Sequence, residues 1–182
     1  MKNLIILLLI ISPVLAMAQG HKGDVDACAP MKNGKVCYTD KITVAKMNKD
    51  AIFNAINEWA KKNYGKDVFL SNVSSSKSKG TISVNSKVEL LLNDTDKTII
   101  KYKMKINCHD EGYDIEMSNI TYQYDPNNDK KYKTYKAEDV IANGGKSNVV
   151  AIIKDPKLFC NATFFFAENL FGEVFDAIQE AE

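Results

Sequence analysis

The stretch TIIKYKMKINCHDEGYDIEMSNITYQY, residues 98–124, decides the fold, because it predicts two strands joined by a short turn. In its first half, apolar side chains fall on every second residue and lysines fall between them. Successive side chains of a strand point to opposite faces, so one face is apolar and the other is charged. The residues HDEG (109–112) are typical of a turn. The segment therefore predicts an antiparallel hairpin with one face buried and the other in water.

The two halves of this hairpin also predict its register. Placing Cys108 opposite Tyr113 across the turn places Lys105 opposite Glu116. Opposite charges at facing positions stabilise a sheet. A β-bulge near Ser118-Asn119 is also predicted, because the inward-facing series of the second strand changes phase there. That series consists of Tyr113, Ile115 and Met117, followed by Ile120, Tyr122 and Tyr124.

Three other segments predict strands and two predict helices. The strand segments are KVCYTDKITV (35–44), DVFLSNVSSS (67–76) and GTISVNSKVELLL (80–92). The serines of the second of these favour a place at the sheet edge. A first helix is predicted over residues 47–65 with Asn48 as its N-cap, and a second begins at Pro156 after the N-cap Asp155. The second helix has a wide aromatic face, which needs a large apolar surface such as a sheet to cover it.

The element order is β-α-β-β-β-β-α, with a polar loop and short-helix excursion over residues 125–155 before the last helix. Hairpin-connected strands form antiparallel sheets, and both amphipathic helices need the same apolar sheet face. The predicted fold class is therefore α+β, an antiparallel sheet with two helices packed on one face. We predict a single domain over residues 35–182, preceded by an N-terminal leader (19–34) with a turn at Asn33-Gly34.

The N-terminus predicts export. Lys2 precedes an apolar run over residues 4–15, and Ala16-Met17-Ala18 has the small-x-small pattern of a cleavage site. This is typical of a signal peptide over residues 1–18, and the run is too short for a membrane-spanning helix. No cysteine directly follows the run, which argues against a lipoprotein. The mature chain is therefore expected in the periplasm or outside the cell, without a transmembrane anchor.

The charge balance argues against nucleic acid as a partner. The full chain has 24 basic and 23 acidic side chains. The signal peptide contains one base, Lys2, and no acid, so the mature chain has no net charge when its histidines are neutral. A nucleic-acid-binding protein usually carries a basic excess.

The cysteines and their neighbours suggest chemistry, but geometry argues against catalysis. Cys108, His109, Asp110 and Glu111 are consecutive, and the first two could in principle form a nucleophile and its base. If Cys108 faces inward, however, His109 faces away or enters the turn. The chain contains no GxSxG, Walker, Rossmann or HExxH motif. We therefore predict no catalytic residues and a protein that is not an enzyme.

Disulfides are expected, because an exported chain with an even number of cysteines usually forms them. The short spacing makes Cys28–Cys37 the easiest pair to close. Cys108 and Cys160 both project toward the core on the predicted elements. They either form the second disulfide or remain small buried thiols.

No metal site or cofactor is predicted. His21, Cys28 and Cys37 lack the close spacing of metal ligands. An acidic and amide-rich stretch resembles part of a calcium loop, but the DxDxDG register is absent. That stretch consists of Asp125, Asn127, Asn128 and Asp129.

One row of lysines has two interpretations. Lys101, Lys103 and Lys105 point to the solvent face of the predicted sheet. They form either a phosphate-binding stripe or, more simply, a solvated face neutralised by the acidic row of the next strand. The second interpretation is favoured, and the first makes these lysines a candidate binding face.

The chain resembles a family of secreted Bacteroidetes proteins, a domain of unknown function with a TBP-like fold. The resemblance covers most of residues 36–180 and rests on three structural segments: KITVAKMNKDAIFNAINEWAKKNYG (41–65), KYKMKINCHDEGYDIEMSNITYQY (101–124) and LFGEVFDAIQEA (170–181). It implies a curved antiparallel sheet with helices on one face. The family has no assigned activity and no recognised catalytic residues to transfer. The resemblance implies no DNA binding, because a fold does not determine a function.

These observations favour a non-enzymatic exported binding module. Its partner is expected to be a peptide, a small ligand or an envelope protein. The site is expected on the open sheet face or in a groove between the excursion and the sheet. One alternative is a structural or accessory envelope protein that pairs through the sheet edge at residues 67–76. The other is an enzyme that uses carboxylates.

Overall fold

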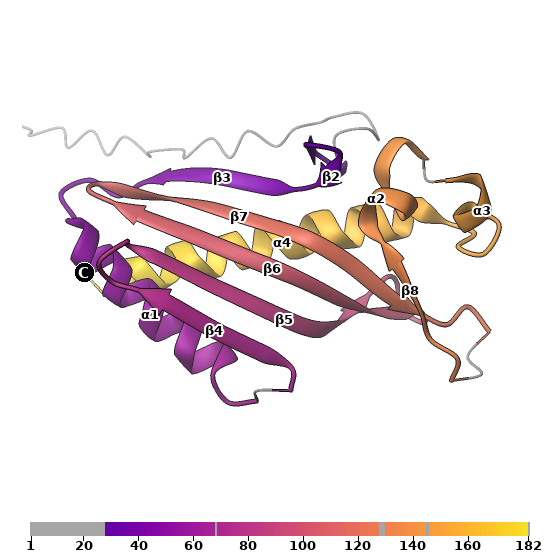
Figure 1. Ribbon diagram of the computed structural model, residues 1–182, viewed down its shortest axis with the longest axis horizontal. Coiled ribbons are helices and arrows are strands. Elements are labelled where there is room, and N and C mark those ends of the chain that lie inside the picture. Colours follow the sequence, from indigo (N-terminus) through magenta and orange to yellow (C-terminus); the bar gives the residue numbers. More distant parts are fainter. Residues whose placement is uncertain (1–27, 68, 128–129, 145, 182) are drawn as a thin grey trace, which may run out of the picture.

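The computed structural model describes residues 28–67, 69–127, 130–144 and 146–181. The predicted signal peptide and the leader up to residue 27 lie outside the described residues. A six-stranded antiparallel sheet forms the centre of the molecule, in the order β3-β7-β6-β5-β4, with β8 paired to the other part of β7 (Figure 1). Its strands are β3 (Tyr38–Thr43), β4 (Ser71–Ser76), β5 (Thr81–Leu91), β6 (Lys97–His109), β7 (Gly112–Tyr124) and β8 (Lys133–Lys136).

Two long helices cover one face of this sheet. They are α1 (Lys49–Tyr64) and α4 (Pro156–Gln179), both behind the strands in Figure 1. The predicted caps are confirmed: the Asn48 side chain accepts a hydrogen bond from the Ala51 amide at 2.9 Å, and Asp155 accepts one from the Lys157 amide at 3.1 Å. The predicted fold class, α+β with two helices on one face of an antiparallel sheet, is confirmed. Among the described residues, no helix has the length and apolar character needed to cross a membrane.

The core lies between the helices and the inward face of the sheet. The alternating residues predicted to face inward on the two central strands are buried, apart from the half-buried Tyr124. The Tyr122 hydroxyl and the Thr163 hydroxyl hydrogen-bond at 2.7 Å, and the rings of Tyr102 and Phe166 meet edge to face at 5.2 Å. The start of α4 therefore lies over the end of β7. The aromatic face of α4 is not buried along its whole width, since Phe175 is exposed.

The predicted hairpin register is confirmed residue by residue. Cys108 pairs with Tyr113, and Lys105 pairs with Glu116. The register shifts between Lys101 and Lys103, at the predicted bulge. Asn119 has φ of 54°, a left-handed conformation that asparagine tolerates better than most residues.

Two regions differ from the prediction. The strand predicted over residues 35–44 breaks at Cys37, and its first part forms a small hairpin of β1 (Met31–Lys32) and β2 (Lys35–Val36) around the predicted Asn33-Gly34 turn. Part of the predicted leader thus belongs to the folded unit. The excursion contains β8, then α2 (Ala137–Val140), η2 (Ala142–Gly144) and α3 (Ser147–Val150). Segments as short as β8 carry too little periodicity to be found by pattern.

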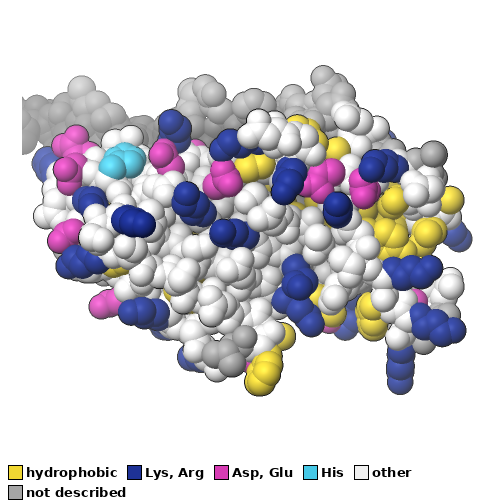
Figure 2. All heavy atoms as spheres, in the orientation of Figure 1, with side chains coloured by type: hydrophobic (Ala, Val, Ile, Leu, Met, Phe, Trp, Pro, Cys, Tyr) yellow, Lys and Arg dark blue, Asp and Glu magenta, His cyan; other side chains and the backbone are white. Residues whose placement is uncertain are grey.

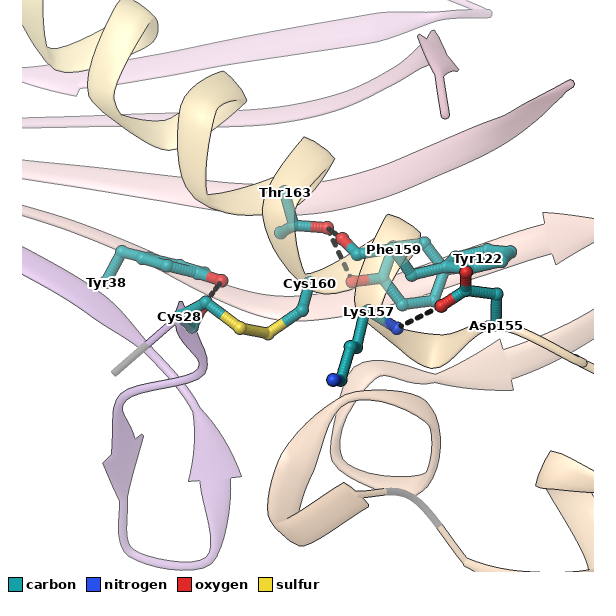
Figure 3. The surroundings of a disulfide bond; sticks show 8 residues. All are labelled: Cys28, Tyr38, Tyr122, Asp155, Lys157, Phe159, Cys160 and Thr163. Carbon is teal, nitrogen blue, oxygen red and sulfur yellow. Dashed lines mark hydrogen bonds between the residues drawn. A yellow bond between two sulfur atoms is a disulfide. The ribbon is translucent and has the colours of Figure 1, made fainter. Parts of the chain in front are cut away.

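The predicted cysteine pairing is wrong. Cys28 forms a disulfide with Cys160, with their Cα atoms 5.6 Å apart (Figure 3). Cys37 and Cys108 are free and buried. Cys37 precedes Tyr38, and consecutive strand residues point to opposite faces. The Tyr38 side chain turns toward the disulfide, donating its hydroxyl proton to the Cys28 carbonyl at 2.6 Å. The Cys37 side chain faces Glu116 instead and is a free thiol.

The direction of α4 explains why Cys108 does not pair with Cys160. Cys160 lies in the first turns of α4, beside the end of β7. Cys108 lies opposite Tyr113, at the start of β7. The two cysteines therefore sit at opposite ends of the long central strand, and the alternative of a free buried thiol holds for Cys108. Burial raises the pKa of the Cys108 thiol to about 11, which keeps it protonated and unreactive.

The stability of cysteine variants distinguishes the Cys28–Cys160 disulfide from the Cys28–Cys37 pairing predicted from the sequence. Replacing Cys160 with Ser should lower the free energy of unfolding by about 2–5 kcal/mol, because the bond closes a long loop of the unfolded chain. Urea unfolding measures this, with Cys37→Ala as the control that leaves the bond intact. Denatured, unreduced protein should expose two thiols. A Cys160→Ser variant as stable as the parent, or a peptide linking Cys28 to Cys37, would contradict the assignment.

The buried tyrosines predict a loss of stability in alkali. Burial raises the pKa of Tyr113 well above its usual value of about 10, and its hydroxyl has no hydrogen-bond partner in the described structure. A raised folded-state pKa stabilises the fold fully below pH 10, and this stabilisation is lost as pH rises from there toward the folded pKa. Tyr113→Phe removes the buried hydroxyl without breaking a hydrogen bond.

The expected result is a free energy of unfolding that falls less steeply above pH 10, by up to about 1.4 kcal/mol per pH unit. Near pH 8 the variant should be as stable as the parent or slightly more so. Tyr122→Phe is the comparison, because it loses the bond to Thr163 and should cost about 1 kcal/mol at pH 8. Identical pH profiles for Tyr113→Phe and the parent would refute the account.

Candidate functional site

The cluster Cys108 to Glu111 forms the end of the β6–β7 hairpin, and its cysteine and histidine lie on opposite faces of the sheet. Cys108 is buried on the helix face, while His109 is exposed and its Nδ1 lies 2.9 Å from the Asp110 carbonyl. The Asp110 carboxylate accepts a hydrogen bond from the Lys49 amide at 2.9 Å, and the Glu111 amide donates to the Met47 carbonyl. The turn therefore fastens the hairpin to the beginning of α1. Its polar groups serve structural contacts.

The sheet face opposite the helices is open and polar. Figure 2 shows this face, where lysines are spread over a surface with few apolar side chains in its middle. Serine, threonine and asparagine occupy most other positions that point outward from β4 and β5. The chain contains no arginine, so every basic group on this face is a lysine. Lysine attracts anions as a point charge and lacks the bidentate fork of arginine.

One groove on this face is lined by side chains of both charges. This mixed-charge groove, of about 500 Å³, lies over the β3–β7–β6 side and is lined by Lys32, Thr39, Asp40, Lys41, Asn107, Asp114, Ile115 and Glu116. Lys32 Nζ lies 2.8 Å from Glu116 Oε2. The hydrogen bond from Lys32 holds the pKa of the Glu116 carboxyl below its usual value. In this groove, lysines and acidic side chains therefore lie close together, as the sequence predicts. Lys105, beside the groove, lies opposite Glu116.

A second groove has an unbalanced positive charge. This lysine groove, of about 570 Å³, is lined by Phe69, Leu70, Ser71, Asn72, Asn85, Ser86, Lys87, Lys101, Tyr102, Lys103, Asn119 and Thr121. None of the described residues that line it is acidic. Within the part of the chain that the structure describes, no ion pair involves its three lysines. The predicted lysine row is thus divided: Lys101 and Lys103 line this groove, and Lys105 does not.

Strand pairing brings two of these lysines face to face. Lys87 of β5 lies directly opposite Lys101 of β6, and like charges at facing positions destabilise a sheet. On the other side of β6, Lys101 faces Thr121 and Lys103 faces Ser118, so neither faces a carboxylate. The bulge at Asn119 sits beside this cluster, and bulges redirect side chains and leave a residue of the ladder unpaired. The arrangement concentrates positive charge where the fold does not neutralise it.

One end of the lysine groove is apolar. Phe69 and Leu70 lie just before β4 and line the groove, and the Phe69 side chain is 93% exposed. The Asp67 carboxylate accepts a hydrogen bond from the Phe69 amide at 2.9 Å, which shapes this turn. At the other end, Lys35 of the β1–β2 hairpin donates to the Asn119 side chain at 3.3 Å. The groove thus has an apolar end at β4 and a polar end at β7.

A third groove lies between the excursion and the sheet, where the sequence also suggested a site. This excursion groove, of about 460 Å³, is lined by Asp96, Tyr124, Pro126, Asn127, Ala151, Ile152, Ile153, Lys154, Asp155, Leu158 and Phe159. Three of its polar side chains already have partners inside the protein: the Tyr124 hydroxyl donates to Asp96 at 2.8 Å, and Asp155 caps α4. The groove therefore offers fewer free polar groups than the lysine groove.

The candidate metal ligands named from the sequence do not form a metal site among the described residues. Within the described residues, no three His, Cys, Asp or Glu side chains are grouped to hold a metal ion. His21, Asn128 and Asp129 lie outside the described residues. The Asp125 carboxylate accepts hydrogen bonds from the amides of Asn127 and Lys131, as expected for a loop.

Sequence reasoning missed two parts of the lysine groove. Lys87 was not grouped with Lys101 because they belong to different strands and meet only through the β5–β6 register. Phe69 was assigned to a strand, whereas β4 begins at Ser71 and leaves Phe69 in the preceding turn. The signal for Lys87 was available, since alternation along residues 80–92 puts it on the solvent face.

Comparisons with known proteins show which family has this fold. Residues 38–123 match the family described as "Domain of unknown function (DUF4468) with TBP-like fold". The crystal structure of a TBP-like protein from Parabacteroides distasonis ATCC 8503 is 75% identical, with a TM-score of 0.81 over 85% of this chain and 99% of that chain. The crystal structure of a DUF4468 family protein from Bacteroides ovatus ATCC 8483 shares the fold, with a TM-score of 0.70 and 20% identity over 83% and 90% of the two chains. A search of curated proteins found no match.

The family match spans the strand before α1, α1 itself and almost all of the β6–β7 hairpin, where two of the three segments of the resemblance lie. High identity over nearly the whole of the Parabacteroides chain extends the agreement beyond the part that the family match covers. The chain therefore belongs to the DUF4468 family of proteins with a TBP-like fold.

Proposed function

We propose that this protein is an exported, non-enzymatic binding module that holds an anionic ligand in its lysine groove. The observation that carries the proposal is the groove formed by Lys87, Lys101 and Lys103. Among the described residues, these lysines form no ion pair and no carboxylate lines the groove. Like charges held close together repel each other, and an anion removes that repulsion. The Cys28–Cys160 disulfide is compatible with an oxidising compartment, which supports export.

The chemistry of the groove supports binding and offers little for catalysis. Lysine ammonium groups, asparagine amides and a threonine hydroxyl bind anions and hydroxyl groups. The free thiols lie elsewhere and are buried, and burial raises the pKa of both Cys37 and Cys108. The carboxylate with a displaced pKa, Glu116, is shifted downward by Lys32, which makes it a poorer proton donor near neutral pH.

The triple variant Lys87→Gln, Lys101→Gln and Lys103→Gln should weaken binding of inorganic tripolyphosphate about tenfold. Each exposed contact contributes a few tenths to one kcal/mol, and the combined loss approaches that factor. Titration of the mature protein followed by NMR amide shifts measures affinity and position together. Lys79→Gln in the β4–β5 turn is the matched control, because it removes an exposed lysine away from the groove.

In the parent protein, the shifts should gather on β5, β6 and the bulge of β7. Added sodium chloride should weaken the binding, because salt screens exposed charges. Amide shift changes that are centred on residues around Lys79 or on the mixed-charge groove would refute the proposal. So would a triple variant that binds the probe as well as the parent does.

A second candidate function is strand addition at β4, and the sheet order favours it. β4 is an edge strand whose six residues include no charge and no proline, the usual protections of an exposed edge. β3, on the opposite side of the sheet, carries Asp40 and Lys41. An extended segment of another chain could pair with β4 through backbone hydrogen bonds.

The purified chain offers a direct test of this edge, because a second copy presents the same strand. Sedimentation at rising protein concentration should reveal a dimer, and Ser75→Lys should return it to a monomer by placing a charge on the exposed edge. Thr39→Lys on β3 is the control. A parent chain that stays monomeric throughout would rule out pairing between copies at β4.

A further inference from the structure

The lysine groove runs across the strands. Its lining residues come from β4, β5, β6 and β7 in turn, beginning at Asn72 and ending at Thr121. Three steps between neighbouring strands, at about 4.8 Å each, give roughly 14 Å of groove. That length suits an elongated ligand better than a single small ion. The lysines occupy its middle, on β5 and β6.

The direction of the groove limits how a ligand can be recognised. β5 and β6 are each paired on both sides, so their backbone groups are used by the sheet itself. A ligand crossing them must be recognised by side chains. The polar side chains that line the groove on the open face are hydroxyl, amide and ammonium groups: Asn72, Asn85, Lys87, Lys101, Lys103, Asn119 and Thr121.

This set of groups matches a ligand that carries many hydroxyls and some acidic groups. Hydroxyls both donate and accept hydrogen bonds, as do the amides and hydroxyls of the groove. An acidic peptide fits less well, because its backbone amides and carbonyls need regular partners. Those partners are offered by a sheet edge such as β4 and not by the face of the sheet.

The apolar end of the groove supplies a further contact. The Phe69 ring is 93% exposed and Leu70 lies next to it. A sugar ring presents a flat face of C–H groups that packs against an aromatic ring. From these features we infer that the ligand of the lysine groove is an elongated acidic carbohydrate, with acidic groups at Lys87, Lys101 and Lys103 and a sugar ring against Phe69. This inference rests on the proposed function of the groove.

Four probes of defined chemistry test the inference on the mature chain: tetragalacturonate, monomeric galacturonate, maltotetraose and an oligoglutamate of four residues. Calorimetry should show the tightest binding for tetragalacturonate, with the monomer at least about tenfold weaker because it reaches fewer contacts. Maltotetraose has the same number of rings without carboxylates and should bind more weakly. Oligoglutamate has the charges without the rings and should also bind more weakly.

One pair of variants isolates the aromatic contact. Phe69→Ala should weaken tetragalacturonate about fivefold or more, which is a larger loss than for tripolyphosphate, because tripolyphosphate has no sugar ring to pack against Phe69. Phe165→Ala is the matched control, since Phe165 is a 63% exposed phenylalanine on α4, on the other side of the sheet. Both variants should fold, because each removes an exposed side chain.

The outcomes separate this inference from the proposed function. Oligoglutamate binding as tightly as tetragalacturonate, or an unchanged Phe69→Ala variant, would overturn the carbohydrate assignment and leave anion binding in place. If monomeric galacturonate binds as tightly as tetragalacturonate, the inference that the ligand is elongated is wrong. If neither tripolyphosphate nor any acidic probe binds, both proposals fail. If maltotetraose binds as tightly as tetragalacturonate, the lysines do not contribute to binding, and the proposed function is wrong as well.

Discussion

The antiparallel pairing of β6 with β7 is the interaction on which the rest of the structure depends. These are the two longest strands, and each has a further strand on its other side. Their side-chain period of two sends one set of residues to the core and the other to water, so a slip of one residue would exchange the two faces. The turn at Asp110-Glu111 holds the register and also receives the beginning of α1. The hairpin therefore orients both the sheet and its first helix.

The bulge at Asn119 links this pairing to the open face. Without it, the apolar residues of the second half of β7 would continue in the wrong phase and face water. The inserted residue brings Ile120 and Tyr122 back into the core, where Tyr122 meets Thr163 of α4. It also moves the partner of Lys101 by one residue, from Ile120 to Thr121, while Lys103 keeps Ser118, its partner in the register set by the turn. One irregularity thus serves the core and gives Lys101 a polar partner, Thr121, in the lysine groove.

Local patterns predicted most of the fold because the deciding information was local. Alternation gave the faces of β5, β6 and β7, and the caps Asn48 and Asp155 marked the starts of the helices. The cysteine pairing was beyond such reasoning. It depends on α4 starting over the end of β7, which brings Cys160 to Cys28, and helix direction on a sheet leaves no trace in spacing. For the site, the alternation along β6 was enough to place Lys101 and Lys103 on the solvent face. Their separation from Lys105 depended on tertiary partners.

The distribution of charge separates a stabilising surface from one that is left to bind. Overall the charges nearly cancel, and the mixed-charge groove shows that cancellation locally through Lys32 and Glu116. A sheet evolved only for stability would be expected to place an acid opposite Lys87 or Lys101, since exposed positions accept either charge at little cost. The chain places two lysines opposite each other instead. Because lysine attracts charge without fixing geometry, the selectivity of such a groove has to come from its shape, from its amides and hydroxyls, and from the aromatic ring at its end.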